Sequence, residues 1–141
     1  MNRIETMKHK MMAAGLDAAV IVPGPNFFYL TGLTMHLSER ITMTVYPVSG
    51  EPFVICPKLE AEKIKRITGI EKTYPWSDEE GPMGAARQAF ADSGLSETTI
   101  GCEYRATRLL EWDLILQALQ QKVTIRPLDD ILNQMRTVKD E

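Results

Sequence analysis

The sequence of 141 residues predicts an α/β domain of three layers, in which a mixed β-sheet has helices on both faces. One observation is that short apolar segments, rich in β-branched residues, alternate with amphipathic segments of about a dozen residues. The other is the sequence Ser-Gly-Glu at residues 49–51, which separates two predicted strands by the length of a hairpin turn. Strands joined by helices run parallel and strands joined by a hairpin run antiparallel, so the sheet is expected to combine both.

A helix and a buried strand are predicted at the start of the chain. Apolar residues recur at helical spacing within residues 2–14, and Gly15 stands where a left-handed residue ends a helix. Residues 18–22 are continuously apolar, as in a strand that is covered on both faces. The sequence Pro-Gly-Pro at residues 23–25 then ends the strand.

A short helical turn and a β-hairpin follow. Asn26 opens the turn, and three of its apolar side chains are expected to pack inward. These are Phe27, Phe28 and Leu30. Residues 41–48 and 52–56 are rich in β-branched and aromatic residues and form the two strands of the hairpin.

The next helix begins after Pro57 and ends at Gly69. Leu59, Ile64 and Ile67 are expected on its inward face, with lysines, arginine and glutamates on the face exposed to solvent. Its charged residues therefore have a structural explanation as a solvated face.

A strand at residues 70–74 leads to a helix that Met83, Ala86 and Phe90 define and that Gly94 ends. The acidic residues at 78–80 precede this helix, where negative charge complements the helix dipole. We therefore expect these carboxylates to stabilise the start of the helix.

The last part of the chain continues the alternation with strands at residues 98–102 and 123–125. Between them lies a helical stripe that places Trp112 in the core rather than on a cofactor. The stripe consists of Leu109, Trp112, Leu116 and Leu119. Pro127 then breaks the chain, and Asp129 and Asp130 are expected to cap a final amphipathic helix. Its apolar face holds Leu128, Ile131, Leu132, Met135 and Val138.

Composition limits the classes of function. Hydrophobic residues make up 44% and charged residues 25% of the chain, which is ordinary for a single soluble domain. The net charge of −3 and the dispersed basic residues argue against a nucleic-acid partner. The longest apolar run is too short to cross a membrane and no export signal is evident, so we expect a cytoplasmic location. Cys56 and Cys102 are then expected to be reduced residues of the core.

The chain lacks the residues for a catalytic centre of its own. His9 and His36 are its two histidines, and no His-Glu-x-x-His spacing is present, so we expect neither a metal site nor catalysis here. No glycine-rich loop for phosphate follows a strand, and no serine or cysteine lies in the context of a nucleophile.

Several segments, in order and spacing, resemble the N-terminal domain of the creatinase, prolidase and Xaa-Pro aminopeptidase family, and most of all an Xaa-Pro dipeptidase. They are residues 15–18 (Gly-Leu-Asp-Ala), 26–32 (Asn-Phe-Phe-Tyr-Leu-Thr-Gly), 39–40 (Glu-Arg), 50–57, 100–103 and 135–141. The resemblance implies the ribonuclease H-like architecture of that domain over residues 1–133. Residues 134–141 would then begin a linker to a C-terminal metallopeptidase domain of the pita-bread fold, which this chain does not contain.

The resemblance also implies what the longer protein does. In the family, the C-terminal domain holds two divalent metal ions, commonly Mn, Co or Zn, through two aspartates, a histidine and two glutamates, none of which falls in this chain. Such proteins cleave the bond before proline in a dipeptide or at a peptide N-terminus. This chain would be the non-catalytic half of a homodimeric enzyme, and its loop at residues 33–40 would close the partner's active site.

Three residues of this loop, His36, Glu39 and Arg40, are the candidates for contact with substrate across the dimer. We expect Arg40 to pair with a substrate carboxylate through both arms of its guanidinium, which would favour short substrates. The alternative is an ion pair of Arg40 with Glu39 or another acid, and an ordinary exposed role for His36. Asn26 and Tyr29 also match family positions, and we interpret both as structural.

Two other functions stay open at this point. The same two-domain scaffold carries metal-free C–N hydrolysis in creatinase-like amidinohydrolases, and the sequence of the other half would distinguish that activity. The chain could also be a stand-alone module that binds a small ligand or a protein, which a natural stop after Glu141 would favour. We expect a truncated form instead, because the sequence stops within an amphipathic helix.

Overall fold

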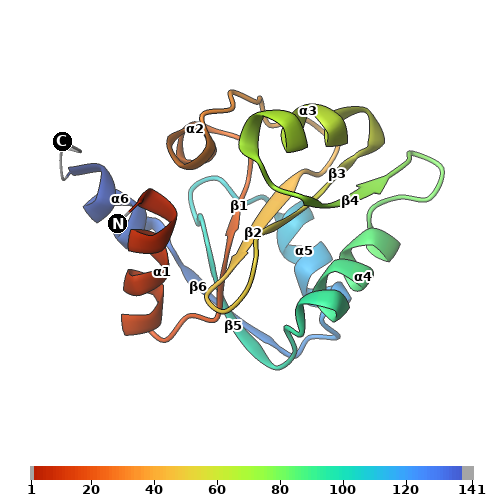
Figure 1. Ribbon diagram of the computed structural model, residues 1–141. Coiled ribbons are helices and arrows are strands. Elements are labelled where there is room, and N and C mark those ends of the chain that lie inside the picture. The colour runs from red at the N-terminus through yellow and green to blue at the C-terminus, as the bar shows by residue number, and fades with distance from the viewer. Residues whose placement is uncertain (1, 138–141) are drawn as a thin grey trace.

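The computed structural model describes residues 2–137, which form a six-stranded mixed sheet between two layers of helices (Figure 1). The strands are β1 (Ala18–Ile21), β2 (Met43–Pro47), β3 (Phe53–Pro57), β4 (Lys72–Trp76), β5 (Thr98–Cys102) and β6 (Val123–Pro127). The helices are α1 (Arg3–Ala13), α2 (Pro25–Thr31), α3 (Lys58–Thr68), α4 (Met83–Ser93), α5 (Leu109–Ala118) and α6 (Asp129–Thr137). The three-layer α/β prediction is confirmed.

The strand order is β4-β3-β2-β1-β5-β6. β2 pairs antiparallel with both β1 and β3, whereas the other neighbouring strands pair parallel. The carboxyl ends of the five remaining strands therefore lie at the edge where β2 begins. We call this the carboxyl edge, and it is where ligands bind in open α/β sheets.

Each face of the sheet has its own apolar core. Residues of α4 and α5 pack on one face, as shown by Ala86, Phe90 and Ile115. The other face is covered by α1, α2, α3 and α6. Cys56 and Cys102 are free thiols buried in these two cores, as predicted, and burial raises the pKa of each to about 12.

Five apolar residues that were predicted to point inward are substantially exposed. They are Phe28, Leu59, Ile67, Leu109 and Trp112. The inward face of α5 carries Glu111, Leu114 and Ile115 in place of the predicted stripe, although Leu119 is buried as expected. Apolar residues surround much of α5, so their spacing permits more than one inward face. Leu59 lies in the first turn of α3 at the carboxyl edge, where it is 96% exposed.

The acidic segments also differ from the prediction. α4 begins after Pro82 without a side-chain cap or an acidic residue in its first turn, so residues 78–80 do not stabilise it. Asp129 and Asp130 do lie in the first turn of α6, but the Asp129 carboxylate accepts the backbone N–H groups of Tyr104 and Arg105.

β4 begins later than the predicted residues 70–74, because Ile70 packs in the core before it. The predicted contribution of Val138 to α6 lies outside the described residues.

Candidate functional site

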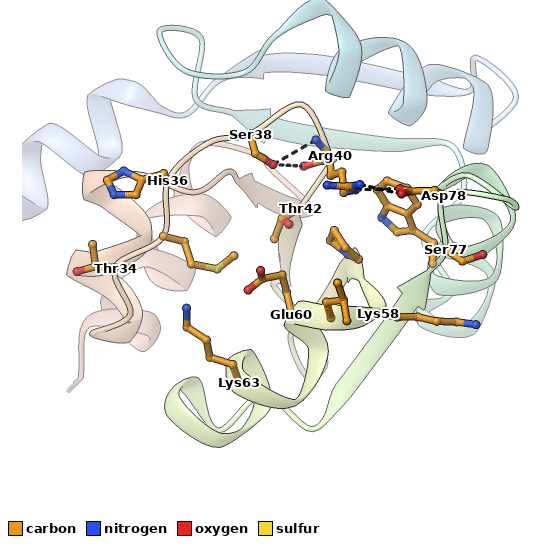
Figure 2. Close-up of a pocket in the computed structure, with 14 residues that line it drawn as sticks. Thr34, His36, Ser38, Arg40, Thr42, Lys58, Glu60, Lys63, Ser77 and Asp78 are labelled. Atoms are coloured by element: carbon orange, nitrogen blue, oxygen red, sulfur yellow. Dashed lines mark hydrogen bonds and ion pairs between the residues drawn. The ribbon is translucent and has the colours of Figure 1, made fainter.

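A groove of about 570 Å³ opens at the carboxyl edge, where three segments far apart in the sequence meet (Figure 2). Its walls are the loop at residues 34–42 before β2, the first turns of α3, and residues 76–78 at the end of β4. We call it the loop groove. Its charged lining consists of Arg40, Lys58, Glu60, Lys63 and Asp78, and His36 also lines it. The groove thus gathers cationic groups beside two carboxylates.

A buried contact holds the end of the loop in place. The indole Nε1 of Trp76 donates a hydrogen bond to the carbonyl of Ile41 at 3.1 Å, and Trp76 is 8% exposed. The Ser38 hydroxyl braces the adjacent turn, since it accepts the N–H of Arg40 and donates to the carbonyl of the same residue. Hydrogen bonds therefore hold the backbone on both sides of Arg40, from which its side chain extends into the groove.

Arg40 forms a two-point ion pair with Asp78 across the groove. Its Nε lies 2.8 Å from Asp78 Oδ1 and its Nη2 lies 2.7 Å from Asp78 Oδ2 (Figure 2). The hydrogen bonds from Arg40 hold the pKa of the Asp78 carboxyl below its usual range, and Asp78 raises the pKa of Arg40. Both side chains are at least half exposed, so the pair contributes little to the stability of the fold.

The structure brings two of the three predicted loop residues together in the loop groove. His36 and Arg40 line it, and His36 is exposed. Glu39 is exposed and does not line the groove. The ion pair considered for Arg40 exists, and its partner is Asp78. The sequence could not indicate this pairing, because Asp78 lies 38 residues away in a segment that resembles a helix start.

A second polar cluster, which no local sequence pattern predicted, lies where β1 and β5 end. Glu103 is 3% exposed, and its carboxylate accepts the N–H of Val22 and the side-chain amide of Asn26, both at 2.8 Å. Burial raises the pKa of Glu103, against the opposing effect of these hydrogen bonds. Arg136 of α6 donates to the Asn26 carbonyl oxygen at 2.9 Å, which links the buried carboxylate to the last helix. The sequence feature that could have pointed to this cluster is the position of Glu103, a charged residue directly after the buried strand β5.

The structural interpretation of Asn26 and Tyr29 is confirmed by these contacts. Asn26 bridges Glu103 and Arg136, as described above. The Tyr29 hydroxyl donates to the carbonyl of Met135 at 3.3 Å, and the Arg3 guanidinium lies 3.9 Å from the centre of the Tyr29 ring. Both residues therefore fasten α2 to the helices beside it.

Residues 2–137 contain no group of three or more His, Cys, Asp or Glu side chains that could hold a metal ion. Within the same residues, no helix has the length and apolar character needed to span a bilayer.

Comparison with known sequences agrees with this architecture. Residues 3–138 match the model of the creatinase/prolidase N-terminal domain. The protein named probable dipeptidase PepE of Mycobacterium tuberculosis is 30% identical over 131 residues, which cover 91% of this chain and 33% of that protein. An uncharacterized peptidase of Staphylococcus epidermidis is 25% identical over 138 residues, which cover 94% of this chain and 39% of that protein. The chain thus spans between a third and two fifths of the length of these relatives.

Solved structures share the fold over nearly the whole chain. A dipeptidase from Pyrococcus horikoshii is 27% identical with a TM-score of 0.85, and the match covers 99% of this chain and 38% of that one. A proline dipeptidase structure from Streptococcus pneumoniae matches with a TM-score of 0.87 at 20% identity, over 99% of this chain and 100% of that one. On the family match and this fold, the chain belongs to the creatinase/prolidase N-terminal domain family.

Proposed function

We propose that this chain is the non-catalytic N-terminal domain of a cytoplasmic, metal-dependent Xaa-Pro peptidase, and that it serves dimerisation and closes the partner subunit's active site. The dipeptidase form is favoured over the aminopeptidase. The observation that carries the proposal is the Arg40 guanidinium in the loop groove, at the carboxyl edge of a domain whose relatives are named dipeptidases. Catalysis itself would take place in another domain of the longer protein, which we place after residue 133.

The described residues do not fit a metal site, so the two divalent ions of the family, Mn, Co or Zn, belong in this proposal to the other domain. What this chain contributes is recognition. A guanidinium binds a carboxylate through two parallel hydrogen bonds, and a free carboxylate next to proline distinguishes a dipeptide from a longer peptide. Arg40 would therefore select short substrates, with His36 as the second polar group of the loop.

Exposed apolar side chains beside the groove support an interface at this face. Leu59 is 96% exposed in the first turn of α3 and lines the groove, and Leu37 on the loop is 39% exposed. A nearly fully exposed leucine next to a polar recess can become buried when a partner covers this face. A second copy of the longer protein, placed by a two-fold axis, would cover this face.

Hydrolysis of an Xaa-Pro dipeptide and of its C-terminal amide by the full-length protein, supplied with Mn, tests the proposal. The native protein should prefer the free dipeptide, since the amide lacks the carboxylate. Arg40→Ala should raise KM for the dipeptide about tenfold or more, as expected for the loss of a charge-assisted hydrogen bond, and should abolish the preference over the amide. Both proteins should remain dimeric in sedimentation.

Arg87→Ala is the matched control, because Arg87 is exposed on α4, on the opposite face of the sheet. It should leave both KM values unchanged. Unchanged kinetics in Arg40→Ala would reduce Arg40 to a structural residue and overturn its substrate role. Absence of Xaa-Pro hydrolysis in the native protein would shift the assignment to a creatinase-like amidinohydrolase or a binding module.

A further inference from the structure

The ion pair between Arg40 and Asp78 uses one edge of the guanidinium. Nε donates to Oδ1 and Nη2 donates to Oδ2, which is the side-on arrangement. An arginine carries five N–H groups, so the edge formed by Nη1 and the second hydrogen of Nη2 is not used by Asp78. No other hydrogen bond of these nitrogens occurs among residues 2–137. The end-on edge of Arg40 is thus available to a second carboxylate.

The ion pair is not needed to hold the loop. The buried hydrogen bond from Trp76 to the carbonyl of Ile41 already joins the end of β4 to the backbone beside Arg40. Exposed ion pairs contribute little to stability, and here both partners are exposed. The effect of Asp78 is therefore on the direction of the guanidinium rather than on the path of the chain.

Asp78 itself lies on a hydrogen-bonded turn. The N–H of Gly81 donates to the carbonyl of Ser77 at 2.8 Å, and the Ser77 hydroxyl donates to the Glu80 carboxylate at 3.0 Å. Glu80 also lies 3.9 Å from the Lys58 ammonium of α3. The hydrogen bonds within the turn thus set the position from which the Asp78 carboxylate reaches Arg40.

We propose that Asp78 is a positioning residue for Arg40: it holds the side-on edge of the guanidinium so that the end-on edge receives the carboxylate of a dipeptide substrate. The inference rests on the proposed function, in which Arg40 faces substrate. A free arginine side chain must lose the freedom of several rotatable bonds when it binds a ligand. An arginine already held by Asp78 has lost that freedom before the substrate arrives, which strengthens binding.

If Asp78 instead competed with the substrate for Arg40, its removal would change KM in the opposite direction. A carboxylate that merely neutralised Arg40 would compete with the substrate, and its removal would tighten binding. A positioning carboxylate makes binding weaker when it is removed. The sign of the change in KM therefore separates the two roles.

Steady-state kinetics of the full-length protein with an Xaa-Pro dipeptide provide the test. Asp78→Asn should raise KM on the order of three- to tenfold, the effect of one side chain left unordered, with kcat changed less than twofold. Asp78→Glu should restore part of the loss. The double variant Arg40→Ala/Asp78→Asn should match Arg40→Ala alone, because Asp78 acts through Arg40.

Glu79→Gln is the matched control, since it removes a neighbouring exposed charge that lies in no described hydrogen bond or ion pair. Its KM should equal that of the native protein. An unchanged or lowered KM in Asp78→Asn, together with a raised KM in Arg40→Ala, overturns the positioning role and leaves the proposed function intact. An unchanged KM in Arg40→Ala defeats the proposed function itself.

An independent readout uses the 141-residue chain alone. The Nε–H signal of Arg40 in nuclear magnetic resonance should show an ordered side chain in the native chain and a mobile one in Asp78→Asn. Glu79→Gln should leave that signal unchanged. A mobile Arg40 in the native chain would contradict the positioning role irrespective of any activity.

Discussion

The buried carboxyl group of Glu103 makes the stability of the fold depend on pH. Its carboxylate accepts hydrogen bonds from Val22 and Asn26, yet burial still raises its pKa above the ordinary 4.5. As pH rises above that ordinary value, the unfolded chain releases this proton before the folded chain does. The folded state then binds more protons than the unfolded state, so the contribution of Glu103 to stability falls with rising pH until its folded pKa is passed.

Glu103→Gln should therefore be most destabilising at low pH. We expect a loss of about 1–3 kcal/mol there, because both oxygens of the protonated carboxyl can accept a hydrogen bond, whereas the NH2 group of glutamine cannot, which leaves Val22 or Asn26 without its acceptor. The loss should shrink as pH rises, since the variant lacks the ionisation that weakens the native protein. Urea unfolding of both proteins at several values between about pH 4 and 8 measures this difference. A difference that is flat or that grows with pH would contradict the raised pKa.

At the scale of elements, local pattern was enough to predict the alternation of strands and helices, including β1, the hairpin of β2 and β3, and the apolar face of α4. It failed for the face of α5, where apolar residues occur on several sides and the buried Glu111 pairs with Arg108. It also could not predict the partner of Arg40. His36 and Arg40 could be proposed as candidates from their loop, but the contacts of Asp78 and Glu103 depend on the strand order, which no local pattern records.

The close packing of β5 gives a prediction at the same scale. A Cβ at Gly101 would lie 2.8 Å from Leu16 Cδ1 and 3.1 Å from Leu128 Cδ1, and both leucines are buried. Gly101→Ala should therefore destabilise the domain by about 1–3 kcal/mol, as overpacking does. Gly84 lies in α4, where an added Cβ would have nothing within 4 Å, so Gly84→Ala should stabilise by about 0.4–1 kcal/mol.

Thermal unfolding of the two variants compares the same chemical change in two environments. The midpoint should fall for Gly101→Ala and rise slightly for Gly84→Ala. If Gly101→Ala were neutral, Leu16 and Leu128 would have room to move and their packing against β5 would be looser than the structure shows.

At the scale of the whole molecule, the antiparallel β2 places the loop before it at the carboxyl edge, where Glu103 also lies because β5 ends there. The cluster around Glu103 is closed by its own hydrogen bonds and reaches α6 through Arg136. The loop groove remains open, with Leu59 beside it. The proposed dimer would cover the groove, while the hydrogen bonds of the Glu103 cluster hold α6 against α2.

Leu59 and Leu109 provide a matched pair for testing that dimer. They are 96% and 80% exposed, so a charge at either position should leave the fold intact, but only Leu59 lies at the loop groove. Leu59→Glu should weaken the dimer of the full-length protein about tenfold or more, since it replaces an apolar side chain at the proposed contact with a charge that must lose water there. Leu109→Glu should leave the association unchanged, because α5 packs on the opposite face of the sheet.

Sedimentation over a range of protein concentrations measures the association, and dipeptide hydrolysis in the same samples connects it with activity. If Arg40 acts on the partner's substrate, activity in Leu59→Glu must fall with the dimer as the protein is diluted and recover as concentration is raised. Full activity in a monomeric Leu59→Glu would mean that Arg40 serves its own subunit. A Leu59→Glu protein that dimerises as tightly as the native one would place the interface elsewhere on the molecule.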